Sequence, residues 1–155
     1  MTEKEKSFLK LHAIQLSSIS VVELYIRTNQ YPDPSIKLEL DDVPMLIGHS
    51  EYDEESNSIQ VSAKIEIGIE EGSDKKTPYS LRVELVGDFF VDETEFPIAQ
   101  IYDWAARNAP MILQPYLREH VFALTARAGF NPLILPLIEV PTLVQKQKEI
   151  IDDES

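Results

Sequence analysis

Histidines are the side chains of this sequence best suited to bind a metal ion or to carry protons near neutral pH. The chain has three of them, His12, His49 and His120, and they lie far apart along the sequence. Zinc ligands usually come in closely spaced pairs, and no such pair is present. We therefore expect three separate surface or loop histidines, no metal site and no cofactor.

Two further patterns could carry chemistry. Residues 7–10 match the Ser-x-x-Lys motif of serine acyl-transferases, but they lie in a charged segment without a companion motif. Residues 51–55 hold four carboxylates, yet they lack the alternating ligands and the central glycine of a calcium loop. We interpret the first pattern as a chance match and the second as a solvated hairpin turn.

The common motifs of catalysis are missing from the sequence. It contains no Gly-x-Ser-x-Gly, no Walker loop, no Gly-x-Gly-x-x-Gly and no His-Glu-x-x-His. It also has no cysteine, which excludes a thiol nucleophile and disulfide bonds. The sequence thus predicts a protein that is not an enzyme.

Length and charge narrow the classes of partner. The 155 residues fit one domain, 1–155, in which we expect about 1–8 and 152–155 to be disordered. With 14 basic and 27 acidic residues the formal charge is 14 − 27 = −13. This charge repels nucleic acid and anionic membranes and favours a basic or flexible polypeptide partner.

The N-terminal residues lack the apolar core of a secretion signal, and no apolar run is long enough to insert into a membrane, so we expect a cytoplasmic protein.

The first half of the chain has the period of two that is typical of strands. Apolar residues alternate with polar ones over 59–70, and the same pattern recurs over 36–41 and 81–85. A first strand over 11–27 changes phase, which predicts a bulge near Ser17 and Ser18. The short connections between these segments favour a four-stranded antiparallel sheet, as a meander or a Greek key.

The second half changes to a helical period. Asn108 is a candidate helix cap, Pro110 lies in the early turns, and Gly129 can end the helix in a left-handed conformation. Pro115 lies inside this helix and predicts a kink. The segment 96–106 before it is expected to form a short separate helical turn. One apolar stripe runs along the long helix through Leu113, Leu117, Val121, Leu124 and Ala128.

The segment that follows the helix is apolar but contains two prolines. Residues 130–138 cannot form an interior strand, and we expect them to lie extended along a surface on which they pack. A last amphipathic stretch over 141–151 predicts a short C-terminal helix. The fold class is therefore α+β, with the sheet, one long kinked helix and a short final helix.

The helix stripe and the segment 130–138 supply more apolar surface than one face of a four-stranded sheet requires. One interpretation is a core together with an oligomer interface. The other is a groove for unfolded peptides, with an acidic rim that keeps the particle soluble and attracts basic segments. The residues themselves leave both open.

Two stretches of this region resemble the SecB family of export chaperones: NAPMILQPYLRE at 108–119 and RAGFNPLILP at 127–136. The order of four strands, kinked helix, extended linker and short last helix is also similar. The resemblance implies a homotetramer built as a dimer of dimers, with no enzymatic activity. Such a protein acts as a holdase, which keeps unfolded preproteins competent for export and delivers them to SecA.

The resemblance also implies which residues bind. SecA docking is expected on acidic side chains of the first and fourth strands, where a gap-free match gives Val22 and Val83 and a slipped match gives Glu23 and Glu84. We prefer the slipped match, because alternation with Leu81, Val83 and Leu85 places Glu84 on the solvent face. The client groove is expected to use Met111, Leu113, Tyr116, Leu117, Phe130, Leu133, Leu135, Leu137, Leu143 and Val144.

Two alternatives stay open at this point. The first keeps the fold and changes the client, as in a SecB-like chaperone dedicated to one partner such as the antitoxin of a toxin–antitoxin system. The second is a binding module without chaperone activity, for example a structural subunit or a lipid-pocket protein on the same α+β layout. The second predicts a closed pocket, whereas both chaperones need exposed apolar surface.

Overall fold

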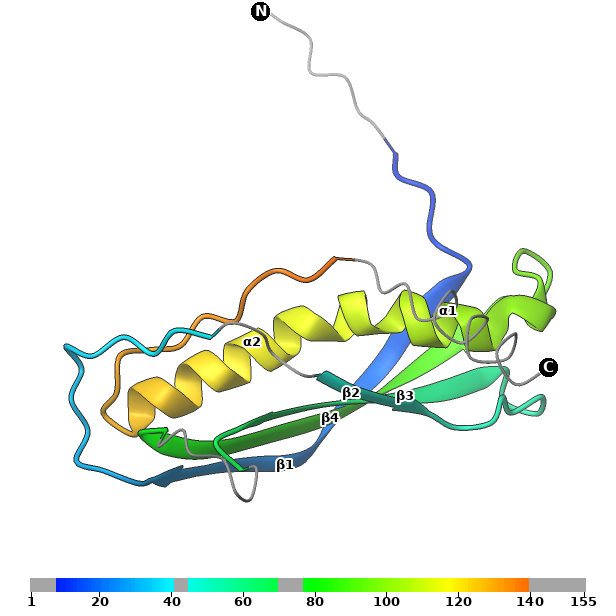
Figure 1. Ribbon diagram of the computed structural model, residues 1–155. Coiled ribbons are helices and arrows are strands. Elements are labelled where there is room, and N and C mark those ends of the chain that lie inside the picture. Colours follow the sequence, from blue (N-terminus) through cyan, green and yellow to red (C-terminus); the bar gives the residue numbers. More distant parts are fainter. Residues whose placement is uncertain (1–7, 41–44, 70–76, 140–155) are drawn as a thin grey trace, which may run out of the picture.

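The computed structural model describes residues 8–40, 45–69 and 77–139 (Figure 1). Within these ranges it is an α+β fold, as predicted. The predicted C-terminal helix over 141–151 lies outside the described residues. The elements in chain order are β1 (Ile14–Thr28), β2 (Met45–His49), β3 (Ser58–Ile67), β4 (Tyr79–Val91), the 3-10 helix η1 (Ile98–Gln100), α1 (Ile101–Arg107) and α2 (Ala109–Arg127).

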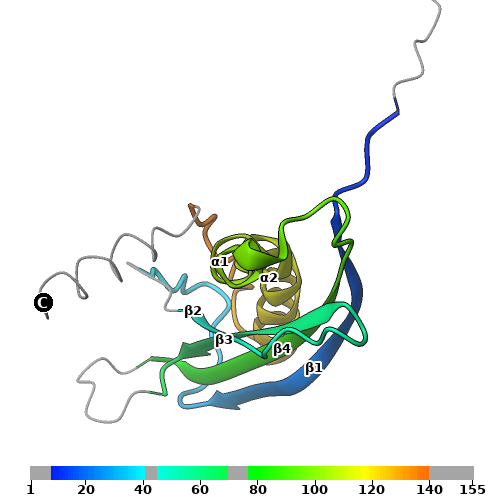
Figure 2. The ribbon, with the colours of Figure 1, turned by 90° about the vertical axis from the view of Figure 1, so that its right-hand side faces the viewer.

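The strands form one antiparallel sheet in the order β1-β4-β3-β2 over the described residues. Strands β2, β3 and β4 are consecutive neighbours, and β1 lies beside β4. The sequence left a meander and a Greek key open, and the observed strand order is that of a Greek key. Both helices lie on the same face of the sheet, and no helix or strand of the described residues covers the other face, called the uncovered face below (Figures 1 and 2).

The core lies between this sheet face and α2. Alternate side chains of β3 and β4 are buried there, while the residues between them are partly exposed. Helix α2 adds Leu113, Leu117 and Val121, all fully buried. Gly87 permits the close approach, because a Cβ atom at this position would lie 2.9 Å from Leu113 Cδ2.

Two bulges interrupt the pairing of β1 with β4. One lies between Leu16 and Ser18, where the phase change predicted it, and the other lies between Val21 and Glu23. Each bulge turns the following residues over by one position, which keeps apolar side chains facing the core on both sides of it. Strand β1 is an edge strand, and Val22 on it is 56% exposed.

The strand predicted over 36–41 is wrong for its described residues, because 36–40 form no strand. The second strand is Met45–His49 instead. Alternation indicates that one side of a segment is buried, whichever neighbour covers it. In 36–40, Leu38 and Leu40 pack against the core from a non-strand segment. Strand β4 is longer than predicted, since it runs from Tyr79 to Val91.

The helical half follows the predictions except at one end. Segment 96–106 contains η1 and most of α1, Pro115 lies inside α2, and Gly129 has a left-handed φ of 92°. Asn108 directly precedes α2, as predicted, but its side chain makes no capping hydrogen bond. Its backbone is helical, and its N–H donates to the Trp104 carbonyl at 2.7 Å, so α1 leads almost directly into α2.

Candidate functional site

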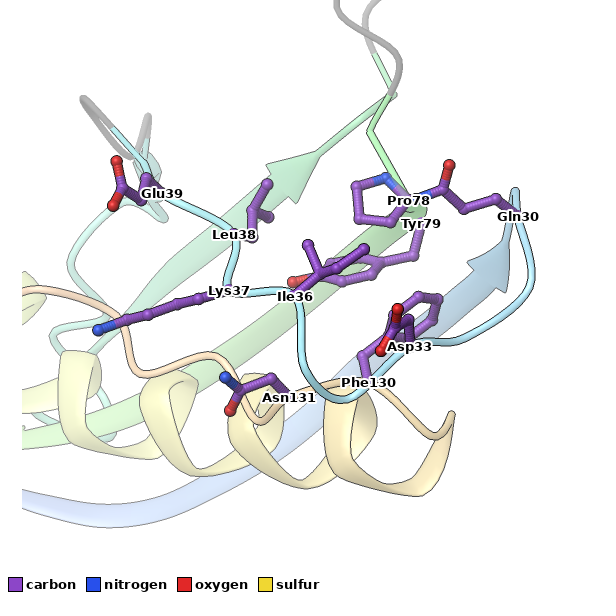
Figure 3. A pocket seen from close by; sticks show the side chains of 10 residues that line it. All are labelled: Gln30, Asp33, Ile36, Lys37, Leu38, Glu39, Pro78, Tyr79, Phe130 and Asn131. Atoms are coloured by element: carbon purple, nitrogen blue, oxygen red, sulfur yellow. The ribbon is translucent and has the colours of Figure 1, made fainter.

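Two extended segments from distant parts of the chain lie side by side near the C-terminal end of α2. One is the β1–β2 connection, and the other is the linker 130–138 after α2 (Figure 1). A cavity of about 370 Å³ lies between them (Figure 3), and a second cavity of about 580 Å³ shares Lys37, Leu38, Glu39 and Asn131 with it. Together they form one groove. The first cavity is lined by Gln30, Asp33, Ile36, Lys37, Leu38, Glu39, Pro78, Tyr79, Phe130 and Asn131.

Helix α2 fixes the linker that forms one wall. The Leu133 N–H donates to Thr125 Oγ1 at 2.9 Å. Farther along, Arg118 Nε donates to the Leu135 carbonyl at 3.1 Å, and Gln114 Nε2 donates to the Pro136 carbonyl at 3.0 Å. These bonds hold the linker by its backbone, and Leu133, Ile134 and Pro136 of the held stretch line the second cavity. The linker is extended and packed, as predicted.

The deep end of the groove is aromatic. The rings of Tyr79 and Phe130 lie 4.8 Å apart at an interplanar angle of 59°. Tyr79 is 1% exposed, and burial raises the pKa of its hydroxyl to about 12. Both rings line the first cavity while little of either is exposed, so this end of the groove has an aromatic wall.

The rim of the groove is charged. Asp33 and Glu39 are exposed on the β1–β2 connection, with Lys37 between them. The hydroxyl and the backbone N–H of Ser35 both donate to Asp33 Oδ1, at 2.6 and 2.9 Å, and hold the pKa of this carboxyl below its usual value. The rim therefore carries negative charge near an apolar interior.

The structure brings some of the predicted groove residues together. Phe130 and Leu133 line the two cavities, and Leu135 is buried in the same linker. Leu137 follows on the linker and is 80% exposed. The remaining predictions lie elsewhere: Leu113 and Leu117 in the sheet–helix core, Met111 and Tyr116 on α2 away from both cavities, and Leu143 and Val144 outside the described residues.

Sequence reasoning missed the β1–β2 connection and Tyr79 as groove residues. A signal was present in the connection, since Ile36 and Leu38 are apolar next to two prolines, but it was interpreted as a strand. Gln114 and Thr125, which hold the linker, carried no signal in the sequence, because only the structure shows that these polar side chains are buried and have a specific partner.

The two acidic docking candidates lie on the uncovered face of the sheet. The Glu84 side chain points away from the core, opposite to the buried Val83 and Leu85, as the alternation predicted. Glu23 is its direct cross-strand partner. Arg82 lies beside them, donating from Nη1 to Glu23 Oε1 at 2.7 Å and from Nε to Glu66 Oε1 at 3.3 Å. These hydrogen bonds raise the pKa of Arg82, with the bond to Glu23 contributing most.

The histidines occupy separate places in the fold. His12 Nδ1 accepts from the Ile14 N–H at 2.9 Å, His49 stacks on Tyr102 at 5.0 Å, and His120 lies on α2. Across 8–40, 45–69 and 77–139 no group of three or more His, Asp or Glu side chains is placed to hold a metal ion.

In the same ranges, no helix combines the length and apolar character needed to cross a bilayer. The acidic residues 51–55 form a hairpin turn, closed by pairing of Asp53 with Ser58.

Comparison with known proteins identifies the family. The sequence model of the family described as preprotein translocase subunit SecB matches residues 10–150, which is most of the chain. The chain belongs to the SecB family. The resemblance seen at 108–119 and 127–136 is thereby confirmed.

Individual relatives agree with this assignment. A protein-export protein SecB of Anaplasma phagocytophilum is 32% identical over 84 residues, which are 54% of this chain and 53% of that protein. The alignment thus spans about half the length of this SecB. A protein of Methanocaldococcus jannaschii described as uncharacterized is 28% identical over 144 residues, covering 92% of this chain and 90% of that one.

A solved structure supports the fold. It is a Mycobacterium tuberculosis SecB-like chaperone in complex with a ChAD peptide from the HigA1 antitoxin, 19% identical to this chain. The TM-score is 0.66, over 81% of this chain and 91% of the other. At this identity the match establishes a SecB-like fold for the present chain.

Proposed function

We propose that the protein is an ATP-independent holdase that binds unfolded preproteins, keeps them competent for Sec-dependent export and delivers them to SecA. The observation that carries the proposal is the groove between the β1–β2 connection and the linker. Its interior is apolar and aromatic, and its rim is charged. Membership in the SecB family supports the same function.

The shape of the groove suits an extended chain. Both walls are themselves extended segments, and apolar surface between them binds side chains without requiring one sequence. The acidic composition of the whole chain attracts basic client segments at long range. A client without folded structure can follow such a groove and contact several subunits at once.

We further propose that the protein acts as a cytoplasmic homotetramer, a dimer of dimers. Support comes from apolar side chains exposed on the single chain. On α2 these include Ile112, Tyr116 and Phe122, each between 38% and 45% exposed, and exposed apolar side chains on a helix favour contact with a second copy. Edge strand β1 exposes Val21 and Val22, which favours pairing or packing with a second copy.

Light scattering tests whether the protein holds unfolded clients and prevents their aggregation. A chemically unfolded client is diluted into buffer with or without the protein, at one tetramer per client and without ATP. We expect suppressed aggregation, and a weaker effect from Ile36→Asp, which places a charge in the groove at a residue that is 54% exposed. Ile98→Asp on η1, outside both cavities, is the matched control. No suppression across several clients would contradict general holding.

The dedicated-partner alternative is favoured by one observation. The SecB-like chaperone with the similar fold was solved with an antitoxin peptide bound. For the present chain this alternative predicts tight binding of one partner and weak suppression of aggregation for unrelated clients. The same scattering assay, run with a panel of clients, therefore separates the two functions.

A further inference from the structure

Tyr79 carries a polar group that the fold leaves unsatisfied. The residue is 1% exposed, and its hydroxyl has no hydrogen-bond partner among the described residues. A buried hydroxyl without a partner is unfavourable, and native proteins tolerate few of them. Tyr79 also lines the groove, so the unsatisfied group lies at the site proposed for client binding.

The cover over this hydroxyl is weakly held. In Figure 3 the Tyr79 side chain points toward residues 36–38 of the β1–β2 connection, which line the same cavity. Ile36 is 54% exposed, and its N–H donates to the Asp33 carbonyl, a bond within the connection itself. Moving Ile36 aside therefore loses little apolar burial, whereas its neighbour Leu38 stays packed against the core.

We propose that Tyr79 recognises the client backbone, by donating its hydroxyl proton to a carbonyl oxygen of an extended client segment in the groove. This inference rests on the proposed holdase function and adds a polar contact to it. A backbone carbonyl is the acceptor that every client offers, whatever its sequence. Apolar contacts with Phe130 and Ile36 supply adhesion, and the hydrogen bond fixes the client chain in an extended path.

The proposal predicts opposite effects of one substitution. Tyr79→Phe removes the unsatisfied hydroxyl from the free protein, so thermal stability stays equal or rises. The same change removes the donor from the complex, so client affinity falls. A tyrosine with a purely structural role would not raise stability and lower affinity together.

The experiment measures both quantities with a defined probe. The probe is a fluorescein-labelled peptide rich in lysine and phenylalanine, without acidic residues, and its binding is followed by anisotropy. For Tyr79→Phe we expect an affinity about tenfold lower, as for loss of one buried hydrogen bond. Tyr31→Phe is the matched control, since Tyr31 lies on the same connection and is 93% exposed.

A second peptide tests the acceptor. In this peptide ester linkages replace the backbone amides, which weakens each carbonyl as an acceptor. The difference in affinity between wild type and Tyr79→Phe should be smaller for the ester peptide than for the amide peptide. Comparing both proteins with both peptides forms a thermodynamic cycle, in which other effects of the ester on binding cancel. An undiminished difference would overturn backbone recognition.

The outcomes separate this inference from the proposed function. If wild type binds the peptide and Tyr79→Phe binds it equally, Tyr79 recognition is overturned and the holdase stands. A lower melting temperature for Tyr79→Phe would show that the hydroxyl is satisfied in the free protein, which also overturns it. If wild type binds no peptide and suppresses no aggregation, both proposals fail.

Discussion

Glu23 of β1 and Glu84 of β4 are direct cross-strand partners on the uncovered face of the sheet. Two carboxylates in this position repel each other. Arg82 offsets the repulsion from one side, through its 2.7 Å contact with Glu23. Lys64 of β3 is the cross-strand partner of Glu84 on its other side, so the two carboxylates lie between two basic side chains on this face.

Replacing both acids by alanine is expected to weaken SecA binding without unfolding the protein. Both side chains are partly exposed, and exposed ion pairs contribute only about 0–1 kcal/mol. Titration of SecA against wild type and Glu23→Ala/Glu84→Ala measures the effect. The double variant Glu51→Ala/Glu55→Ala removes the same charge from the exposed turn and should bind like wild type. Equal or absent binding for both wild type and the Glu23/Glu84 variant would count against export and favour a dedicated partner.

A methyl group at Gly87 is expected to disturb the packing of α2 on the sheet. It would lie 2.9 Å from Leu113 Cδ2, 3.1 Å from Leu16 Cδ1 and 3.1 Å from Phe89 Cε2, closer than ordinary van der Waals contact. Overpacking of this kind lowers the free energy of unfolding by about 1–3 kcal/mol. Urea denaturation of Gly87→Ala measures it. Gly48→Ala is the control, since its close neighbour is a single rotatable hydroxyl, Ser62 Oγ; an equal loss in both variants would contradict the explanation.

Thr125→Val keeps the shape of a fully buried side chain and removes its oxygen. The Leu133 N–H then has no acceptor, and an unsatisfied buried donor costs about 1–3 kcal/mol. We expect lower stability in urea and faster hydrogen exchange of the Leu133 amide, because the linker is held less firmly. Thr28→Val at the exposed end of β1 should change neither quantity. Unaltered exchange at Leu133 would show that other contacts fix the linker.

Stability is expected to fall in the alkaline range. Burial raises the pKa of Tyr79 to about 12, and burial together with a 2.6 Å hydrogen bond to Glu93 raises that of Tyr52 to about 12. The unfolded chain loses these protons near pH 10, so the stabilisation is complete below pH 10 and is lost as the pH rises toward 12. Urea midpoints across this range should fall less steeply for Tyr79→Phe. Equal slopes for wild type and variant would refute the assignment to Tyr79.

Much of this fold could be predicted from local patterns. The period of two gave β3 and the core face of β4, and the phase change in β1 gave the first bulge. The second strand was placed wrongly, because alternation over 36–40 reports contact with the core and cannot distinguish a sheet from a packed loop. Asn108 marks the start of α2 as predicted, but its side chain does not cap the helix, and its backbone continues the hydrogen bonding of α1 instead.

The candidate site was less predictable than the fold. Its linker wall could be predicted, because prolines in an apolar stretch leave few other conformations. Its other wall is the β1–β2 connection, about a hundred residues earlier in the chain, and no local pattern pairs two such segments. In the sequence Tyr79 resembles any other apolar residue of a strand, and only the three-dimensional arrangement shows that its hydroxyl has no hydrogen-bond partner among the described residues.

The order β1-β4-β3-β2 has a consequence for synthesis of the chain. The first strand made, β1, pairs with the last strand made, β4, so the nascent sheet cannot close until Val91 has left the ribosome. Until then the apolar residues of β1 are exposed on an unfolded chain, and contacts this distant in sequence form slowly. During that interval each new copy is an unfolded polypeptide with exposed apolar residues. It therefore resembles the clients that the folded copies are proposed to hold.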